Sequence, residues 1–241
     1  ALPGVPGPPV RPGARLGADA LSVLVSIWGS RAPFVEAHRR ALARRLLADR
    51  AYNADREVLV LERMKLKFGE TSMQQCKIMI QDLQDSRFNN RSIQDKLRDV
   101  GREKDAANLD AILISDHFWP PLQSEGGMNL HPQVESRFNT YSDTYKILKP
   151  NKTIEWESQL GYVSITLDFD CGVSRTFDDL SPALANLIMF FQETPKWSLP
   201  ALAEAAGERD PGALRRRLAF WERRGVLRPC RGEEEGGGGG G

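Results

Sequence analysis

Apolar residues in the first hundred positions recur at steps of three and four, the spacing of one face of an α-helix. Several such stripes follow one another with only short connections between them. The predicted helices lie at about 19–28, 34–46, 55–68 and 70–85, with a weaker one around Ile93 and Leu97. Because each apolar stripe must be buried against another, this part of the chain is predicted to be a helical bundle.

The spacing of the apolar residues changes after the predicted bundle. Leu109 to Ile114 is an apolar run of strand length, and the stretch that ends in Trp119-Pro120-Pro121 cannot continue as a helix. A helical stripe then returns at 132–149. This part of the chain is therefore predicted to mix strand and helix.

Strand periodicity is clearest in the following stretch. Apolar and polar residues alternate around Ile154 and Trp156, and again over 163–169. Asp170-Cys171-Gly172 supplies turn residues, and Val173 to Phe177 is the predicted returning strand. The expected result is a small antiparallel sheet with a helix laid against it.

The last third of the chain predicts three helices in quick succession. Ser181-Pro182 begins the first, and Ser198 begins a short second one that ends at Gly207. Asp210-Pro211 begins an arginine-rich third helix that ends at Gly225. This order is typical of a helix-turn-helix or a winged helix. The wing is expected to be incomplete, because the chain soon turns to glycine.

The predicted fold class is α+β: an N-terminal helical bundle, a small antiparallel-sheet α/β domain and a C-terminal, incomplete winged helix. Both ends are poor in apolar residues, so they cannot offset the entropy of ordering and are predicted to be disordered. The predicted domains are a Pro/Gly-rich tail at 1–17, the bundle at 18–105, the sheet domain at 106–180, the winged-helix-like domain at 181–229 and a Gly-rich tail at 230–241.

Composition narrows the class of protein. The chain has 241 residues with 33 Lys and Arg against 32 Asp and Glu, and no apolar run reaches the roughly 18 residues of a membrane span. The first residues lack the basic-then-apolar order of a signal peptide. Cys76, Cys171 and Cys230 are widely separated, which favours reduced thiols. We therefore expect a protein of the nucleus and cytoplasm, not a secreted or membrane protein.

The chemistry-bearing residues do not predict an enzyme. No Cys and His pairs have metal-ligand spacing and no glycine-rich loop has the context of a phosphate site, so neither a metal nor a cofactor is expected. Cys76 lies on an apolar helical stripe, which favours a buried thiol over the alternative of a thiol enzyme. His117 has no identifiable nucleophile near it, which favours an ordinary residue over a general base.

Basic residues gather on the last predicted helix. Arg215, Arg216, Arg223 and Arg224 form a candidate surface for a protein or a nucleic acid. One interpretation is functional: these arginines contact nucleic-acid phosphates from a recognition helix. The other, which the spacing of the arginines favours, is that they form an ordinary solvated face of the helix. The alternative function is therefore a winged-helix nucleic-acid-binding protein.

Several separated motifs resemble those of cullins and occur in the same order. Phe34 to Leu47 is similar to the cullin signature Phe-x₇-Leu-Ala-x-Arg-Leu-Leu. Leu66 to Gly69 and then Cys76 to Asp85 resemble a Leu-Lys-x-x-x-Gly stretch leading into a Met-x-x-Asp helix. Ser115 to Pro120 resembles the family's Ser-x-x-Trp-Pro, and Leu180 to Phe191 resembles the helix that opens its first winged helix.

Within the family, the chain resembles the cullin-like subunits of the anaphase-promoting complex. The stretches that carry this likeness are 24–30, 66–70, 214–218 and 221–227, and the resemblance covers about 20–228. The sequence has neither the N-terminal helical repeats nor the second winged helix of full-length members. We therefore expect a fragment or an incomplete gene model.

The resemblance implies a non-catalytic scaffold of a multi-subunit RING ubiquitin ligase that acts in cell-cycle control. A zinc-binding RING subunit would add its extended N-terminal segment as a strand to the sheet, and would recruit a ubiquitin-conjugating enzyme. Other subunits of the complex are further expected partners, whereas a membrane and nucleic acid are not. The expected contacts with the RING subunit are Ile112, Ile114, Trp119, Ile154, Trp156, Val163, Ile165 and Leu167.

Overall fold

The computed structural model describes residues 22–23, 25, 27, 30–102, 104–105, 108–122 and 128–230. The predicted tails at 1–17 and 230–241 lie outside the described residues apart from Cys230, and so does most of the predicted helix at 19–28. Two compact units share the chain. Unit 1 holds the residues up to Arg91 together with Asp110–Leu122, and unit 2 holds Ser92–Leu109 and the residues from Gln123 onward.

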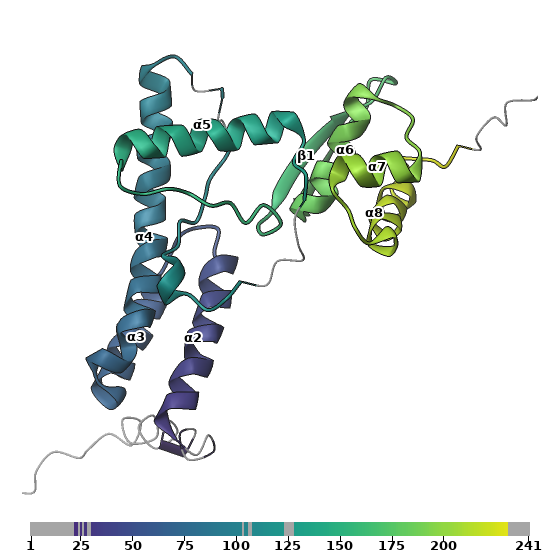
Figure 1. The fold of residues 1–241 in the computed structure, drawn as a ribbon. Helices are drawn as coiled ribbons and strands as arrows, with labels where there is room; N and C mark the ends of the chain where they lie inside the picture. The colour runs from purple at the N-terminus through teal and green to yellow at the C-terminus, as the bar shows by residue number, and fades with distance from the viewer. Residues whose placement is uncertain are drawn as a thin grey trace, which may run out of the picture. The chain divides into compact units, whose positions relative to one another are not determined.

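Unit 1 is helical. It contains α2 (Arg31–Ala48), α3 (Asp55–Phe68) and the residues of α4 (Glu70–Asp99) as far as Arg91, which Figure 1 shows in order along the chain. Acidic residues stand in the first turn of α3 and basic ones in its last turn, as the helix dipole favours. The buried core of this unit consists of Leu42, Ala43, Leu46, Ala54, Leu61, Met64, Phe68, Met73, Cys76, Met79, Ile80, Leu83 and Trp119.

The helix α4 is continuous over 30 residues, so the prediction of separate helices at 70–85 and around Ile93 was wrong. Ser86, Asn89 and Asn90 interrupt the apolar stripe there, which made the helical pattern look broken. All three side chains are buried, with no more than 5% of their surface exposed. Polar residues therefore continue the buried face of this helix.

Unit 2 combines helices with a hairpin. Its helices include α5 (Pro132–Leu148), α6 (Pro182–Glu193), α7 (Leu199–Ala206) and α8 (Pro211–Arg223). Two of the predicted caps are confirmed: Ser198 accepts from the N–H of Ala201, and Asp210 accepts from the N–H of Gly212 at 2.8 Å. Ser181 stands at the N-cap of α6 but its side chain makes no capping bond. Gly207 ends α7 with a φ of 67°, the left-handed conformation that glycine adopts without strain.

The strands β1 (Val163–Asp168) and β2 (Ser174–Leu180) form an antiparallel hairpin in which Ile165 stands opposite Phe177. Its apolar side packs into one core with α6, α7 and α8. The helix laid against β1 is α6, whereas the prediction had placed the helix at 132–149 there. The buried members of this core are Leu180, Ala185, Leu187, Ile188, Leu202, Ala206, Leu214 and Trp221.

The sheet is smaller than the sequence predicted. Among the described residues it has two strands, because neither Leu109–Ile114 nor the stretch around Ile154 and Trp156 pairs in a ladder. No strand follows α8 as far as Cys230, so the C-terminal winged helix is not confirmed. The helices of the described residues include none with the length and apolar character needed to cross a bilayer.

Candidate functional site

A row of polar side chains on α4 binds the backbone of a distant segment. Asp82, Ser86 and Asn90 are four residues apart, so they lie on one face of the helix. We call these three residues the polar stripe. Each of them hydrogen-bonds the main chain of residues 110–115, which follow α4 in the sequence and lie in the same unit.

The bonds along the stripe repeat the pattern of a neighbouring strand. The side-chain amide of Asn90 donates to the carbonyl oxygen of Ala111 at 3.0 Å and accepts from its N–H at 3.1 Å. Oγ of Ser86 accepts from the N–H of Leu113 at 2.8 Å and lies 3.3 Å from its carbonyl oxygen. The carboxylate of Asp82 accepts from the N–H of Ser115 at 2.8 Å.

The spacing of these bonds requires segment 110–115 to be extended. Four residues of an α-helix rise about 6 Å, and two residues of a β-strand advance about 6.6 Å. One step along the polar stripe therefore matches two residues of extended chain, running antiparallel to α4. Ser115 has extended backbone angles, with φ −92° and ψ 101°.

Asp82 also ties two of the cullin-like motifs together. Its carboxylate accepts from Nε1 of Trp119 at 2.7 Å and from the hydroxyl of Ser115 at 2.9 Å, besides the N–H of Ser115. Trp119 is only 5% exposed and belongs to the core of unit 1. The Met79-x-x-Asp82 and Ser115 to Pro120 motifs therefore meet at one carboxylate.

The opposite edge of segment 110–115 is open. Within the part of the chain that the structure describes, the N–H and C=O groups of Asp110, Ile112 and Ile114 make no hydrogen bond. The side chains of Ile112 and Ile114 are partly buried against the core of unit 1. The segment is therefore anchored by its side chains and along one edge, while its other edge presents unpaired backbone groups, as an edge strand does.

The other predicted interface residues pack within their own unit. Nε1 of Trp156 donates to Oγ of Ser142 at 2.9 Å, and its ring stacks on Phe138 at 4.2 Å between centroids. The three apolar residues of β1, which are Val163, Ile165 and Leu167, are partly buried against the core of the hairpin and α6–α8. Their contact with a RING subunit stays a prediction.

Sequence reasoning missed the polar stripe. A signal for it was present, because Asp82, Ser86 and Asn90 recur every four residues beside the apolar stripe that contains Leu83. Buried polar groups are costly unless they are hydrogen-bonded. A polar row on the buried side of a helix therefore indicates a bonded partner, although the sequence does not say which segment that partner is.

The candidate arginines of α8 and its C-cap residue Arg224 are exposed, and two of the four have partners within the chain. Arg216 pairs with Asp210 at 3.4 Å, and the guanidinium of Arg224 lies 3.5 Å from the ring centroid of Phe220. The hydrogen bond from the backbone N–H of Gly212 is the main reason that the pKa of the Asp210 carboxyl is lowered. The remaining two candidates, Arg215 and Arg223, are exposed. Nucleic-acid binding by this surface stays a prediction.

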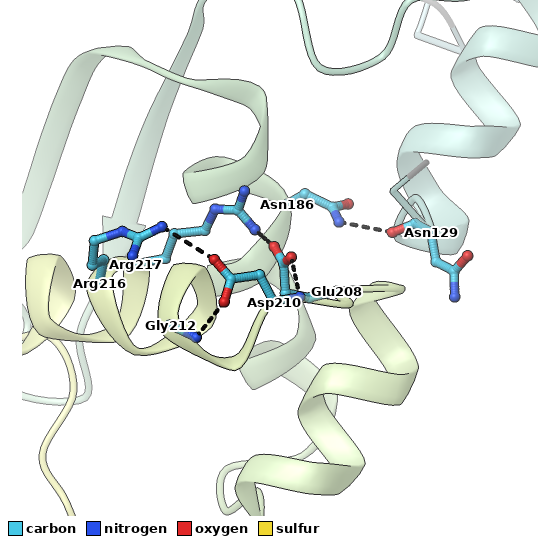
Figure 2. A network of polar contacts seen from close by, with 7 residues as sticks. All are labelled: Asn129, Asn186, Glu208, Asp210, Gly212, Arg216 and Arg217. Atoms are coloured by element: carbon cyan, nitrogen blue, oxygen red, sulfur yellow. Dashed lines mark hydrogen bonds and ion pairs between the residues drawn. The ribbon is translucent and has the colours of Figure 1, made fainter. Parts of the chain in front are cut away.

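Polar contacts hold the start of α8 and the loop before α5. Figure 2 shows Arg217 paired with Glu208, and Asn186 reaching from α6 to Asn129. The side-chain amide of Asn186, which is 4% exposed, donates to the carbonyl oxygen of Asn129 at 2.9 Å and accepts from the N–H of His131 at 2.7 Å. These contacts brace unit 2 and bring no nucleophile and base together.

The two residues weighed for catalysis have ordinary surroundings. Cys76 is 1% exposed in the core of unit 1, and this burial raises the pKa of its thiol to about 11, so the buried interpretation is confirmed. His117 is exposed in a short 3₁₀ turn, Asp116–Phe118. Among the residues that the structure describes, no group of three or more His, Cys, Asp and Glu side chains is placed to hold a metal ion.

The three cysteines differ in exposure, and this difference can be tested by their reactivity. Cys171 and Cys230 are exposed, whereas Cys76 is buried with a raised pKa. We expect two thiols to react rapidly with a disulfide reagent at pH 7.5 and the third only after denaturation, because the thiolate is the reactive species. Mass spectrometry of the labelled peptides would identify each site. Rapid labelling of Cys76 in the folded protein would contradict this arrangement.

Comparison with known proteins agrees with the motifs. No protein-family model matches the chain. Anaphase-promoting complex subunit 2 of Homo sapiens is 32% identical over 215 residues, which cover 89% of this chain and 26% of that protein. The protein of the same name from Arabidopsis thaliana is 36% identical over 219 residues, covering 89% of this chain and 25% of that protein.

A more distant relative extends the comparison. Cullin-4 of Caenorhabditis elegans is 23% identical over 188 residues, covering 77% of this chain and 22% of that protein. The chain spans about a quarter of the length of the curated relatives that it matches. The matches to subunit 2 come from animals, a plant, a slime mould and a yeast. The chain therefore carries a cullin-homology region of the kind found in anaphase-promoting complex subunit 2.

Proposed function

We propose that this chain is a non-catalytic scaffold region that binds a zinc-binding RING subunit by accepting a strand. The RING subunit would recruit a ubiquitin-conjugating enzyme, so that the assembled complex ubiquitinates proteins in cell-cycle control. Other subunits of an anaphase-promoting complex would be its further partners, in the nucleus and cytoplasm. The zinc ions and the ubiquitin-transfer reaction would both belong to the partner proteins.

The open edge of segment 110–115 is the observation that carries this proposal. Asp110, Ile112 and Ile114 offer N–H and C=O groups at alternate residues, which is what an added strand pairs with. The other edge is already bonded to the polar stripe, so the segment is held in place to receive a partner. The predicted contacts Ile112 and Ile114 lie on this segment.

Proline at residue 112 tests the open edge without touching the polar stripe. Proline has no N–H and restricts the preceding residue to extended conformations, which this segment already has. We expect Ile112→Pro to weaken capture of a co-expressed RING subunit about tenfold relative to Ile112→Ala, since one backbone bond and its neighbours are lost. Pull-down followed by titration of the purified chains would measure the difference.

Ile112→Ala is the matched control, because it removes the same side chain but keeps the N–H. Circular dichroism and urea unfolding of both variants would show that they are folded. Equal capture by the two variants would contradict strand addition at this edge. If the unmodified chain and a folded RING subunit form no complex at all, the scaffold proposal itself is wrong.

A further inference from the structure

We propose that the polar stripe of α4 acts in place of a neighbouring strand: it holds segment 110–115 extended before any partner arrives, and so determines which edge accepts the partner. This inference rests on the proposed function and deepens it. Asp82, Ser86 and Asn90 are then positioning residues for binding. They act through the backbone of the segment and do not themselves touch the added strand.

The alternation of the bonds carries the inference. In a β-strand the N–H and C=O of one residue point to the same edge, and those of the next residue point to the opposite edge. The polar stripe engages both groups of Ala111 and lies against both groups of Leu113. The groups of Ile112 must therefore face away from α4. A partner strand can pair with the even-numbered residues and is excluded from the odd-numbered ones.

The burial of the stripe supports a dedicated role. Ser86 is 0% exposed and Asn90 is 4% exposed, at positions where apolar side chains would serve an ordinary helix bundle equally well. Oγ of Ser86 donates to the carbonyl oxygen of Asp82, and Nδ2 of Asn90 donates to the hydroxyl of Tyr52. Both side chains also bond the backbone of segment 110–115. A flexible segment would lose conformational entropy when a partner strand bound, and a segment already held extended has lost it beforehand.

The arrangement of unpaired backbone groups on segment 110–115 indicates what kind of ligand it accepts. The ligand is an extended peptide whose N–H and C=O groups stand opposite those of Asp110, Ile112 and Ile114. Proline is excluded from the positions of that peptide that must donate to this edge, because it lacks the N–H. Recognition through the backbone leaves the partner's side chains to contribute selectivity at the two faces of the added strand.

Amide hydrogen exchange in the unbound chain tests the stripe without any partner. We expect the amides of Ala111, Leu113 and Ser115 to exchange at least about tenfold more slowly than those of Ile112 and Ile114, because bonded amides must open before they exchange. Nuclear magnetic resonance resolves these amides one by one. Equal exchange at alternate residues would overturn the inference while leaving RING binding to be decided by the capture experiment.

A serine variant connects the stripe to binding. We expect Ser86→Ala to speed exchange at the Leu113 amide and to slow association of the RING subunit about fivefold. Ser72→Ala, an exposed serine on the same helix, is the matched control and should change neither. A serine that only stabilised the fold would shift the unfolding midpoint and leave the association rate of the folded protein unchanged. That result would overturn the inference.

Discussion

Replacing Trp221 by alanine is expected to destabilise unit 2 by about 3–5 kcal/mol, the range for removing a large buried aromatic side chain. Trp221 is 0% exposed, and its ring meets Phe177 and Phe220 edge-on, each at 5.2 Å between centroids. Its Nε1 donates to the carbonyl oxygen of Leu184 at 3.1 Å. The side chain therefore joins β2, α6 and α8, and a cavity in its place would loosen all three.

Urea unfolding followed by circular dichroism would measure this loss. Trp221→Phe is the matched variant, because it keeps most of the apolar surface and removes the indole N–H. We expect it to cost about 1–2 kcal/mol, from the lost hydrogen bond and a smaller cavity. A cost below about 1 kcal/mol for Trp221→Ala would mean that the core of unit 2 does not depend on this residue.

Replacing Asp82 by alanine is expected to destabilise unit 1 by about 2–4 kcal/mol, because hydrogen bonds to a charged group are worth more than neutral ones. Three donors lose their acceptor: Nε1 of Trp119, and the N–H and hydroxyl of Ser115. Trp119 is 5% exposed, so water would compensate its indole N–H poorly. The start of the 3₁₀ turn after Ser115 would also be released.

Asp85→Ala is the control for this prediction. Asp85 stands on the same helix, is exposed, and accepts from Nε2 of Gln81 at 2.9 Å. Its loss should cost less than about 0.5 kcal/mol, as for other surface substitutions. Urea unfolding of the two variants separates a specific anchor from a general effect of removing a negative charge. Equal destabilisation would contradict the anchoring role of Asp82.

Local signals predicted most helices well. The stripe at 55–68 coincides with α3 (Asp55–Phe68), and Ser198, Gly207 and Asp210 bound α7 and α8 as their capping chemistry requires. These elements depend on neighbours within about four residues in the sequence, so periodicity and caps suffice to place them. The burial of Cys76 followed from the same periodicity.

Predictions failed where contacts between residues far apart in the sequence determine the structure. The expected break in α4 came from buried polar side chains, of which Ser86 and Asn90 have partners 27 and 21 residues away in the sequence. Strand-like stretches at Leu109–Ile114 and around Trp156 have the right composition but no strand partner among the described residues. A strand is defined by its pairing, and pairing cannot be read from a single segment.

By itself, the sequence of this protein determined its cullin resemblance, the location of most of its helices and of the hairpin, and many of the residues that face a core, because each of these depends on order and spacing along the chain. Only the tertiary structure decided how the backbone of segment 110–115 is bonded. It placed Asp82, Ser86 and Asn90 against alternate residues of that segment, and among the residues that the structure describes it left the backbone of Ile112 unpaired at the other edge. Which edge is bonded depends on the approach of a distant helix, and that approach exists only once the chain has folded.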